Sequence, residues 1–181
     1  IGDWCADIEI GTKYTIKESF VDINGDLLDS PENPMITVRT VVSVESAYGL
    51  TEVDFINEDN EEFYWVIDEN NDVIYYNSVG GAYLATPIEV GTSWDVQSDD
   101  WNNPDISEII TVGGVEEFEI GELDDIIVIA TSSEAGGVIM NKNSYYSPSI
   151  GMEVYSVSRY HMEGADQSND EFHILEIISI D

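Results

Sequence analysis

Alternation of apolar and polar residues runs through almost the whole chain and limits the folds that it can adopt. β-Branched and aromatic residues recur at alternate positions, whereas the spacing of an amphipathic helix is hard to find. Short groups of Gly, Pro, Asn and Asp, which are turn formers, separate the alternating segments. Such short connections favour antiparallel neighbours. We predict strands within 13–23, 35–46, 50–59, 61–77, 107–120, 124–133, 137–147, 152–162 and 171–180.

A seven-residue motif occurs twice and indicates an internal repeat. The chain has IEIGTKY at 8–14 and IEVGTSW at 88–94, and similar strands, Gly turns and an aromatic hairpin follow each copy in the same order. Chance recurrence of a motif that begins a strand is the alternative, but tandem duplication explains the shared order more simply. The expected fold is all-β, with antiparallel strands in a curved sheet, barrel or sandwich built from two similar halves.

The predicted domain organisation follows from this repeat. We expect a single β domain at 8–181, made of repeats 8–85 and 86–181, after a separate N-terminal segment 1–7. In such a domain the two motif glycines should occupy equivalent positions, and the two motif aromatics should both be buried. These four residues are Gly11, Gly91, Tyr14 and Trp94.

The charge of the chain excludes several classes of partner. Asp and Glu number 38 against five Lys and Arg, giving a formal net charge of −33. Five scattered cations cannot form a basic patch, so we expect no binding to nucleic acid. Salt or bound cations must offset the self-repulsion of such a surface. The composition is similar to that of salt-adapted secreted proteins, and we predict an extracellular or cell-surface location.

The segment 1–7 is a candidate for contacts between copies of the protein. Its residues continue an alternating pattern ahead of a repeat that is complete without them, so they could add a strand to the open sheet edge of a neighbour. Its Cys5 is the only cysteine and cannot form an internal disulfide; a buried thiol and an intermolecular disulfide both stay open. We expect a homo-oligomer or polymer. No apolar run is long enough to span a membrane.

Three acidic turns carry oxygen-bearing side chains at alternate positions and are candidate calcium sites. Hard cations bind several oxygens from carboxylates, amides and backbone carbonyls. Solvated turns are the alternative, because Leu27 and Val73 stand where a helix-flanked calcium loop requires Gly. The candidate ligands are Asp22, Asn24, Asp26 and Asp29 in the first turn, Asp68, Asn70 and Asp72 in the second, and Asp166, Asn169, Asp170 and Glu171 in the third.

Motifs of catalysis are missing from the sequence. The chain has no GxSxG, P-loop, GxGxxG or HExxH motif and no paired Cys. Its two histidines, His161 and His173, flank the last predicted hairpin loop, where a metal site with Glu163 or Glu171 is one interpretation and two ordinary strand residues the other. Among 38 acids, a carboxylate pair at glycosidase spacing has little specificity. We predict no enzyme activity and no catalytic residues.

Aromatic residues gather in two predicted hairpins. Exposed rings could form a platform for stacking sugars, whereas buried rings would be core and cross-strand pairs, the interpretation that we favour. The residues concerned are Tyr64, Trp65, Tyr75, Tyr76, Tyr145, Tyr146 and Tyr155.

Three segments resemble elements of bacterial extracytoplasmic proteins, often lipoprotein-like, of unassigned function. TPIEVGTSWDV at 86–96 is similar to their P-x-x-V-G-x-x-W element, and SYYSPSIGMEVYS at 144–156 is similar to Y-Y-x-x-x-V-G-x-V. GVEEFEIGELDDIIVIA at 114–130 resembles the segment between these two, with Leu123 in place of the usual Phe and without its Pro-Ala pair. The resemblance implies an exported all-β envelope or surface protein and supplies no catalytic residue.

These observations predict a non-catalytic extracellular or cell-surface protein. We expect a structural role through self-assembly into a fibre or surface layer, with cations, calcium among them, stabilising the fold. The alternative is a calcium-dependent module that binds a glycan or another surface protein, which requires an exposed aromatic patch.

Overall fold

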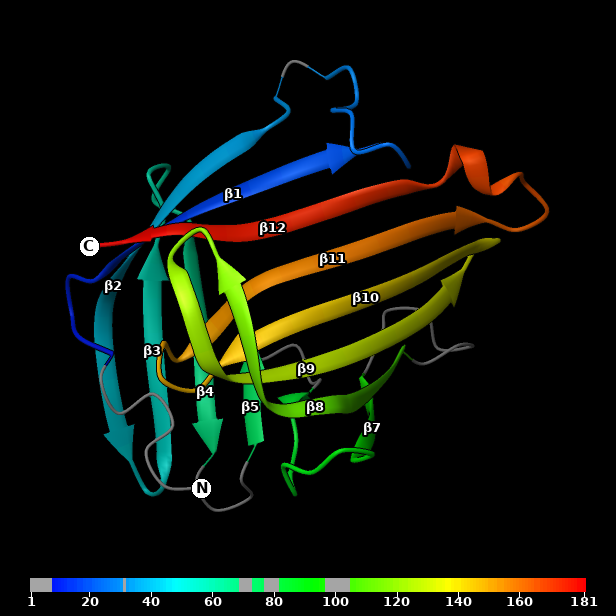
Figure 1. Ribbon diagram of the computed structural model, residues 1–181. Coiled ribbons are helices and arrows are strands. Elements are labelled where there is room, and N and C mark those ends of the chain that lie inside the picture. Colours follow the sequence, from blue (N-terminus) through cyan, green and yellow to red (C-terminus); the bar gives the residue numbers. More distant parts are fainter. Residues whose placement is uncertain (1–7, 31, 69–72, 77–81, 97–104) are drawn as a thin grey trace.

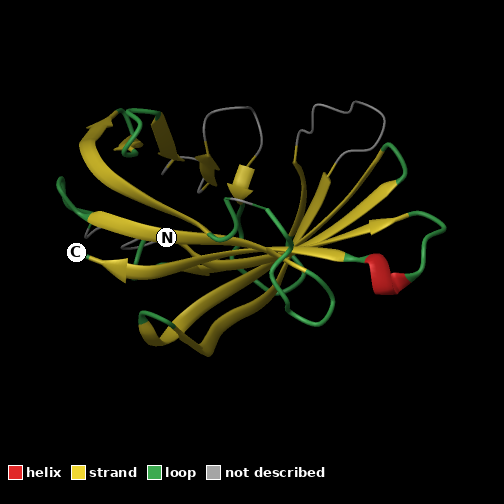
Figure 2. Cartoon of the chain, turned by 90° about the horizontal axis from the view of Figure 1, so that it is seen from above, coloured by secondary structure: helices red, strands yellow, loops and turns green. Residues whose placement is uncertain are grey.

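The computed structural model describes residues 8–30, 32–68, 73–76, 82–96 and 105–181. Within these ranges almost every segment is a strand or a tight turn, and the one helical element is the short 3₁₀ turn η1 (Gln167–Asn169) (Figure 2). The first six strands are β1 (Lys13–Val21), β2 (Met35–Ala47), β3 (Leu50–Ile56), β4 (Glu62–Asp68), β5 (Val73–Tyr76) and β6 (Ala82–Leu84). The others are β7 (Ser93–Val96), β8 (Asp105–Phe118), β9 (Gly121–Ala135), β10 (Val138–Ser147), β11 (Met152–Met162) and β12 (Glu171–Ile180).

All the described strands belong to one antiparallel sheet. Their order is β6-β5-β4-β3-β2-β1-β12-β11-β10-β9-β8-β7, so each half of the chain is a meander and β1 pairs with β12 to join the halves (Figure 1). The described order ends at two short strands, β6 and β7, and does not close into a ring. The predicted all-β fold of antiparallel strands is confirmed, and of the expected forms the curved sheet describes it.

The sheet curls so strongly that inner-face side chains of strands distant in the strand order contact one another. Trp65 of β4 stacks on Tyr146 of β10, with ring centroids 6.1 Å apart, although these strands are distant in the strand order. On β1 the alternation buries Tyr14 and Ile16 in the same core. Trp94, which we expected to be buried like Tyr14, is only partly buried against this core, because it lies on the short edge strand β7.

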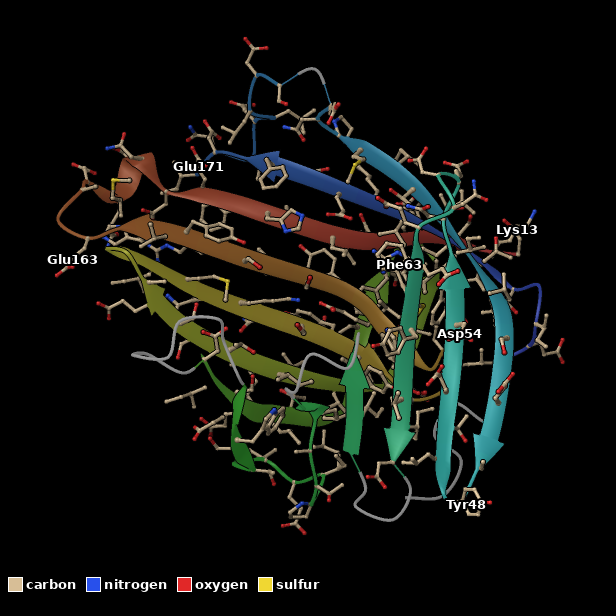
Figure 3. All side chains as sticks on the ribbon, turned by 180° about the vertical axis from the view of Figure 1, so that it is seen from behind. Lys13, Tyr48, Asp54, Phe63, Glu163 and Glu171 are labelled. Atoms are coloured by element: carbon tan, nitrogen blue, oxygen red, sulfur yellow. The ribbon has the colours of Figure 1, made fainter. Side chains whose placement is uncertain are left out.

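Strands β9 to β12 extend beyond the region where the sheet covers itself. Opposite views place β3 to β5 behind the long strands in Figure 1 and in front of them in Figure 3, so the two parts form layers at one end. The far end, where Figure 3 labels Glu163 and Glu171, lies away from this overlap. The inner face of the long strands therefore includes a portion that β3 to β5 do not cover.

The two copies of the repeated motif form the same turn. The N–H of Gly11 donates to the carbonyl of Val41 at 2.8 Å, and the N–H of Gly91 donates to the carbonyl of Ile109 at 2.8 Å. Their φ angles are +98° and +94°, a region that glycine adopts without steric cost. Each turn leads into a strand that pairs with the next strand along the chain, β1 with β2 and β7 with β8. Duplication of the complete halves stays a prediction.

The hairpin formed by β8 and β9 bends across the outer face of the sheet (Figure 1). Phe118, near its tip, has its ring centroid 6.0 Å from that of Tyr145 and 6.1 Å from that of Tyr155. Burial is the main reason that the pKa of Tyr155 lies above its ordinary value. These tyrosines therefore form a packed cluster, as the core interpretation of the aromatic residues predicts, and do not form an open sugar platform.

Candidate functional site

The inner face changes from apolar to polar along β1. Tyr14 and Ile16 are buried in the core, whereas Glu18 and Phe20 follow at the next positions of the same alternation. Because alternate residues of a strand point to one face of a sheet, all four side chains share the inner face. The polar portion therefore continues directly from the core onto the extension of the long strands.

A row of cross-strand partners crosses this polar portion from β1 to β7. Direct partners on neighbouring strands stand side by side on one face, and neighbouring strands lie about 4.8 Å apart. Small polar residues occupy much of the middle, and an aromatic residue stands at each end. We call this set the inner-face row; its members in order are Phe20, His173, Ser158, Lys142, Thr131, Ser107 and Trp94.

A carboxylate, an imidazole and an aromatic ring form one end of the row. His173 Nε2 lies 3.0 Å from Glu18 Oε2, and the imidazole stacks on Phe20 with 4.6 Å between ring centroids and 19° between ring planes. The hydrogen bond with His173 is the main cause that lowers the pKa of Glu18, with the charges of Arg39 and Lys142 adding to it and burial opposing it. Phe20 keeps 45% of its surface exposed.

Lysine and arginine side chains balance the carboxylates of this region. Lys142 Nζ lies 3.0 Å from Glu153 Oε1, and the Arg39 guanidinium lies 4.3 Å from the centre of the Phe63 ring. The two positive charges of Arg39 and Lys142 offset the two negative charges of Glu18 and Glu153. With His counted as neutral, these side chains form a neutral set within a chain of net charge −33. We call the following residues the inner-face cluster: Glu18, Arg39, Lys142, Glu153 and His173.

Small hydroxyl side chains form the base of the polar portion. Ser144, Ser156 and Ser158 each have 3% of their surface exposed, and so does Ser107, whose hydroxyl lies 2.7 Å from that of Thr131. Apolar side chains of larger volume at such positions would extend the core. Serine instead leaves room between the larger side chains of the inner-face cluster and supplies groups that both donate and accept hydrogen bonds.

A second charged group lies at the far end of β11, at the start of β12. Asp170, 2% exposed, accepts a hydrogen bond from Arg159 Nε at 2.6 Å and lies 2.6 Å from His161 Nδ1. The hydrogen bond with His161 is the main cause that lowers the pKa of Asp170, and Arg159 lowers it further. His161 and His173 thus contact different carboxylates, as two separate strand histidines, and the structure does not bring them onto a shared metal.

The first predicted calcium turn is closed by its own hydrogen bonds. Asp22 Oδ1 accepts from the backbone N–H of Asn24 at 2.8 Å and of Asp26 at 3.0 Å, and Asp22 Oδ2 accepts from the Asn24 side chain at 3.2 Å. The bond from the Asp26 backbone contributes most to the lowered pKa of Asp22. Asn24 and Asp26 are exposed. These oxygens are arranged as in a hydrogen-bonded Asx turn.

Of the other two predicted calcium turns, the second is described only in part and the third is described in full. Asn70 and Asp72 lie outside the described residues, and Asp68, at the end of β4, is 9% exposed. Asp166 caps η1 by accepting from the Ser168 backbone at 2.9 Å. In the described part of the chain no group of three His, Cys, Asp or Glu side chains is placed to hold a metal. Calcium binding stays a prediction.

Sequence reasoning missed the inner-face cluster, although a weak signal was present. In KYTIKESFV the apolar positions of the alternation include Glu18, a charged residue in line with Tyr14 and Ile16. Its partner His173 is 155 residues away, and no local pattern predicts that pairing. The signal becomes informative only when the register of β1 and β12 is known.

Comparisons with solved structures show two proteins of similar fold. One is a candidate exported protein with a YmcC-like fold from Bacteroides fragilis NCTC 9343, 11% identical, and the other is a candidate lipoprotein from Parabacteroides distasonis ATCC 8503, 13% identical. Each comparison has a TM-score of 0.51 and covers 96% of both chains. The chain therefore has a fold similar to the YmcC-like fold. The sequence matches no family model and no curated protein.

Proposed function

We propose that this protein is exported, works at the cell surface or outside the cell, and acts by binding without catalysis. Its fold is shared by a candidate exported protein and a candidate lipoprotein, which supports export. Its acidic surface suits a saline or cation-rich exterior. In the described residues, no helix has the length and apolar character needed to cross a membrane.

The inner-face row is the observation that carries the binding proposal. Burying charged groups such as Lys142 and Glu153 costs desolvation energy, and an apolar replacement is often at least as stable. A sheet selected only for stability would continue its aliphatic core along the long strands. The polar portion of the inner face is instead balanced in charge and only partly covered, as expected of a surface that contacts a polar ligand.

The contacts within the inner-face cluster support binding through directional hydrogen bonds. Glu18 is paired with His173, and Lys142 with Glu153. Groups already engaged with a neighbour at 3.0 Å are suited to directional hydrogen bonds with a bound molecule.

Thermal unfolding in the presence of small molecules tests the proposed function. We expect a subset of uncharged and charged polar compounds to raise the melting temperature, because ligands that bind the folded state stabilise it by mass action. Each such effect should be lost in Phe20→Leu, which removes the exposed ring of the inner-face row. Effects that persist in this variant place binding elsewhere, and chemical conversion of any bound compound would contradict a purely binding role.

Self-assembly is a second candidate function, and the two ends of the strand order are where a strand could be added. The described strand order ends at β6 and β7, which are three and four residues long, and sheet edges are sites where an added strand can pair. Residues 1–7, which we expect to supply such a strand, lie outside the described residues, as does Cys5. On this proposal, copies of the protein form a fibre or surface layer by strand addition.

Calcium is proposed as a stabilising ion. The support is the net charge of −33, which divalent cations can offset, together with the oxygen-rich turns. In the alternative function a calcium-stabilised turn presents a surface to a glycan or protein. The proposed ligands are those of the first two turns: Asp22, Asn24 and Asp26, and Asp68, Asn70 and Asp72.

A further inference from the structure

We propose that the inner-face row binds a neutral saccharide, with Phe20 as the ring on which a sugar stacks. This inference rests on the proposed function, because it names the class of ligand for the same surface. It differs from the sugar platform considered for the paired tyrosines, since Tyr145 and Tyr155 pack under Phe118.

The Phe20 ring is exposed and is held in place from two directions. Its ring stacks on the His173 imidazole, and the Asn33 side chain binds its backbone, accepting from the N–H at 2.9 Å and donating to the carbonyl at 2.6 Å. His173 is itself fixed by Glu18. A ring that is already ordered loses little conformational entropy when a ligand binds. Its apolar face suits the C–H face of a pyranose ring.

The charges around Phe20 favour a neutral ligand. An anion would meet the field of a chain with net charge −33. A cation would compete with Lys142 and Arg39 for carboxylates that already balance them. Hydroxyl groups can donate to a carboxylate and accept from an ammonium group without disturbing either charge. Glu18 and Lys142 are placed to bind the polar edge of a sugar in this way.

The length of the inner-face row favours an oligosaccharide over a single sugar. The row continues from β1 to β7 in steps of about 4.8 Å, similar to the length of one hexose unit. Lys142 and Thr131 lie along it, and the partly buried Trp94 stands at the opposite end. An extended ligand can therefore meet Lys142 and Thr131 along the row and an aromatic residue at each end, while Ser107 and Ser158 lie beneath them at 3% exposure.

Titration of the full chain with oligosaccharides, followed by amide NMR, tests this inference. The probes are neutral hexasaccharides of glucose, mannose and xylose in their common linkages, with hexagalacturonate as the acidic probe and a chitosan hexamer as the cationic probe. We expect at least one neutral probe to shift the amides of Phe20, Ser158 and Lys142. Phe20→Leu should weaken this binding by about tenfold, and Phe20→Tyr, which keeps a ring, should restore it.

The control is Tyr48→Leu, which removes a ring that is 99% exposed at the β2–β3 turn and should leave binding unchanged. Circular dichroism establishes that each variant is folded. Three outcomes overturn the saccharide inference: no shift with any neutral probe, shifts that are equal in Phe20→Leu, or tighter binding of either charged probe. If the saccharide inference fails but non-sugar compounds still stabilise the protein in a Phe20-dependent way, the proposed binding function is retained.

Discussion

The titration of the Asp170 carboxyl group makes the stability of the protein depend on pH. Its pKa is lowered by His161 and Arg159, so its ionised form is favoured in the folded state. A carboxyl group of this kind stabilises the fold at pH values above its unfolded pKa, and that stabilisation is lost as the pH falls through the lower folded pKa. The ordinary pKa of an Asp side chain is 3.8, so this stabilisation is lost only in strongly acidic solution.

Replacing Asp170 by Asn should therefore lower stability at neutral pH and flatten its acid dependence. The variant leaves Arg159 and His161 without their shared carboxylate. Urea unfolding midpoints at about pH 7 and about pH 3 measure the effect, and the wild type should lose more than the variant between them. Glu163→Gln, an exposed position in the same loop, is the matched control. An equal pH dependence in Asp170→Asn and wild type would contradict this role.

Lys142 and Glu153 offer a second test at the residue scale. Lys142→Met and Glu153→Gln should each destabilise the protein by about 1–2 kcal/mol, because each leaves a partly buried partner without its counter-charge. The double variant should be less destabilised than the sum of the two, with a coupling of about 1 kcal/mol. Chemical denaturation of the four proteins measures this cycle. Additive effects would show that the pair is not energetically coupled.

At the scale of elements, the repeated turns make the duplication testable. Gly11 and Gly91 have positive φ, and a Cβ at either would have no heavy atom within 4 Å beyond the adjacent residues, so the cost of Ala is conformational. Gly11→Ala and Gly91→Ala should each destabilise the protein by about 1 kcal/mol. Glu9→Ala and Glu89→Ala, in the same turns, are the controls. Clearly unequal costs in denaturant titrations would argue that the two turns are not equivalent.

The β10–β11 turn shows why one motif of the resemblance is structural. Ser147 Oγ donates to Asp125 Oδ1 at 2.8 Å, and the backbone of Ser149 donates to Asp125 Oδ2 at 2.6 Å. The carboxylate comes from β9, so it ties the turn to the neighbouring strand. The SPSIG sequence is thereby a fixed connection that positions two long strands of the inner face.

At the scale of the whole molecule, net charge predicts a response to ions. Calcium at millimolar concentration should raise the melting temperature more than sodium chloride of equal ionic strength, because a specific site adds binding energy to screening. Differential scanning calorimetry measures this. Asp22→Asn and Asp26→Asn test the first turn, and Glu163→Gln is the control for loss of a surface charge. Equal stabilisation by both salts would mean that charge screening explains the whole effect, and it would contradict the proposed calcium sites.

Deletion of 1–7 tests assembly. Ile8, which follows this segment, is partly buried against the core, so the truncated chain should keep the described fold. We expect a folded monomer that no longer associates, measured by circular dichroism and by light scattering at high protein concentration. Unfolding of the truncated chain would identify the segment as an internal strand. A full-length chain that stays monomeric would contradict the assembly proposal itself.

The sequence by itself determined most of the strands and turns and the antiparallel fold class, although the short strands β6 and β7 were not predicted. Alternation is a local property, and the turn residues restrict their own backbone, so neither depends on distant partners. The glycines of the repeated motif stand in similar turns for the same reason: positive φ is a requirement of the turn itself. Composition likewise fixed the net charge of −33.

Only the tertiary structure decided which alternating positions became core and which became the candidate site. Tyr14 and Glu18 belong to one strand and one face, yet Tyr14 packs against Phe55 of β3 in the core, whereas Glu18 stands outside the core cluster. Pairing of Glu18 with His173 depends on β1 meeting β12 from the opposite end of the chain. Such long-range register is set by the closest packing of the whole sheet, and no local pattern contains it.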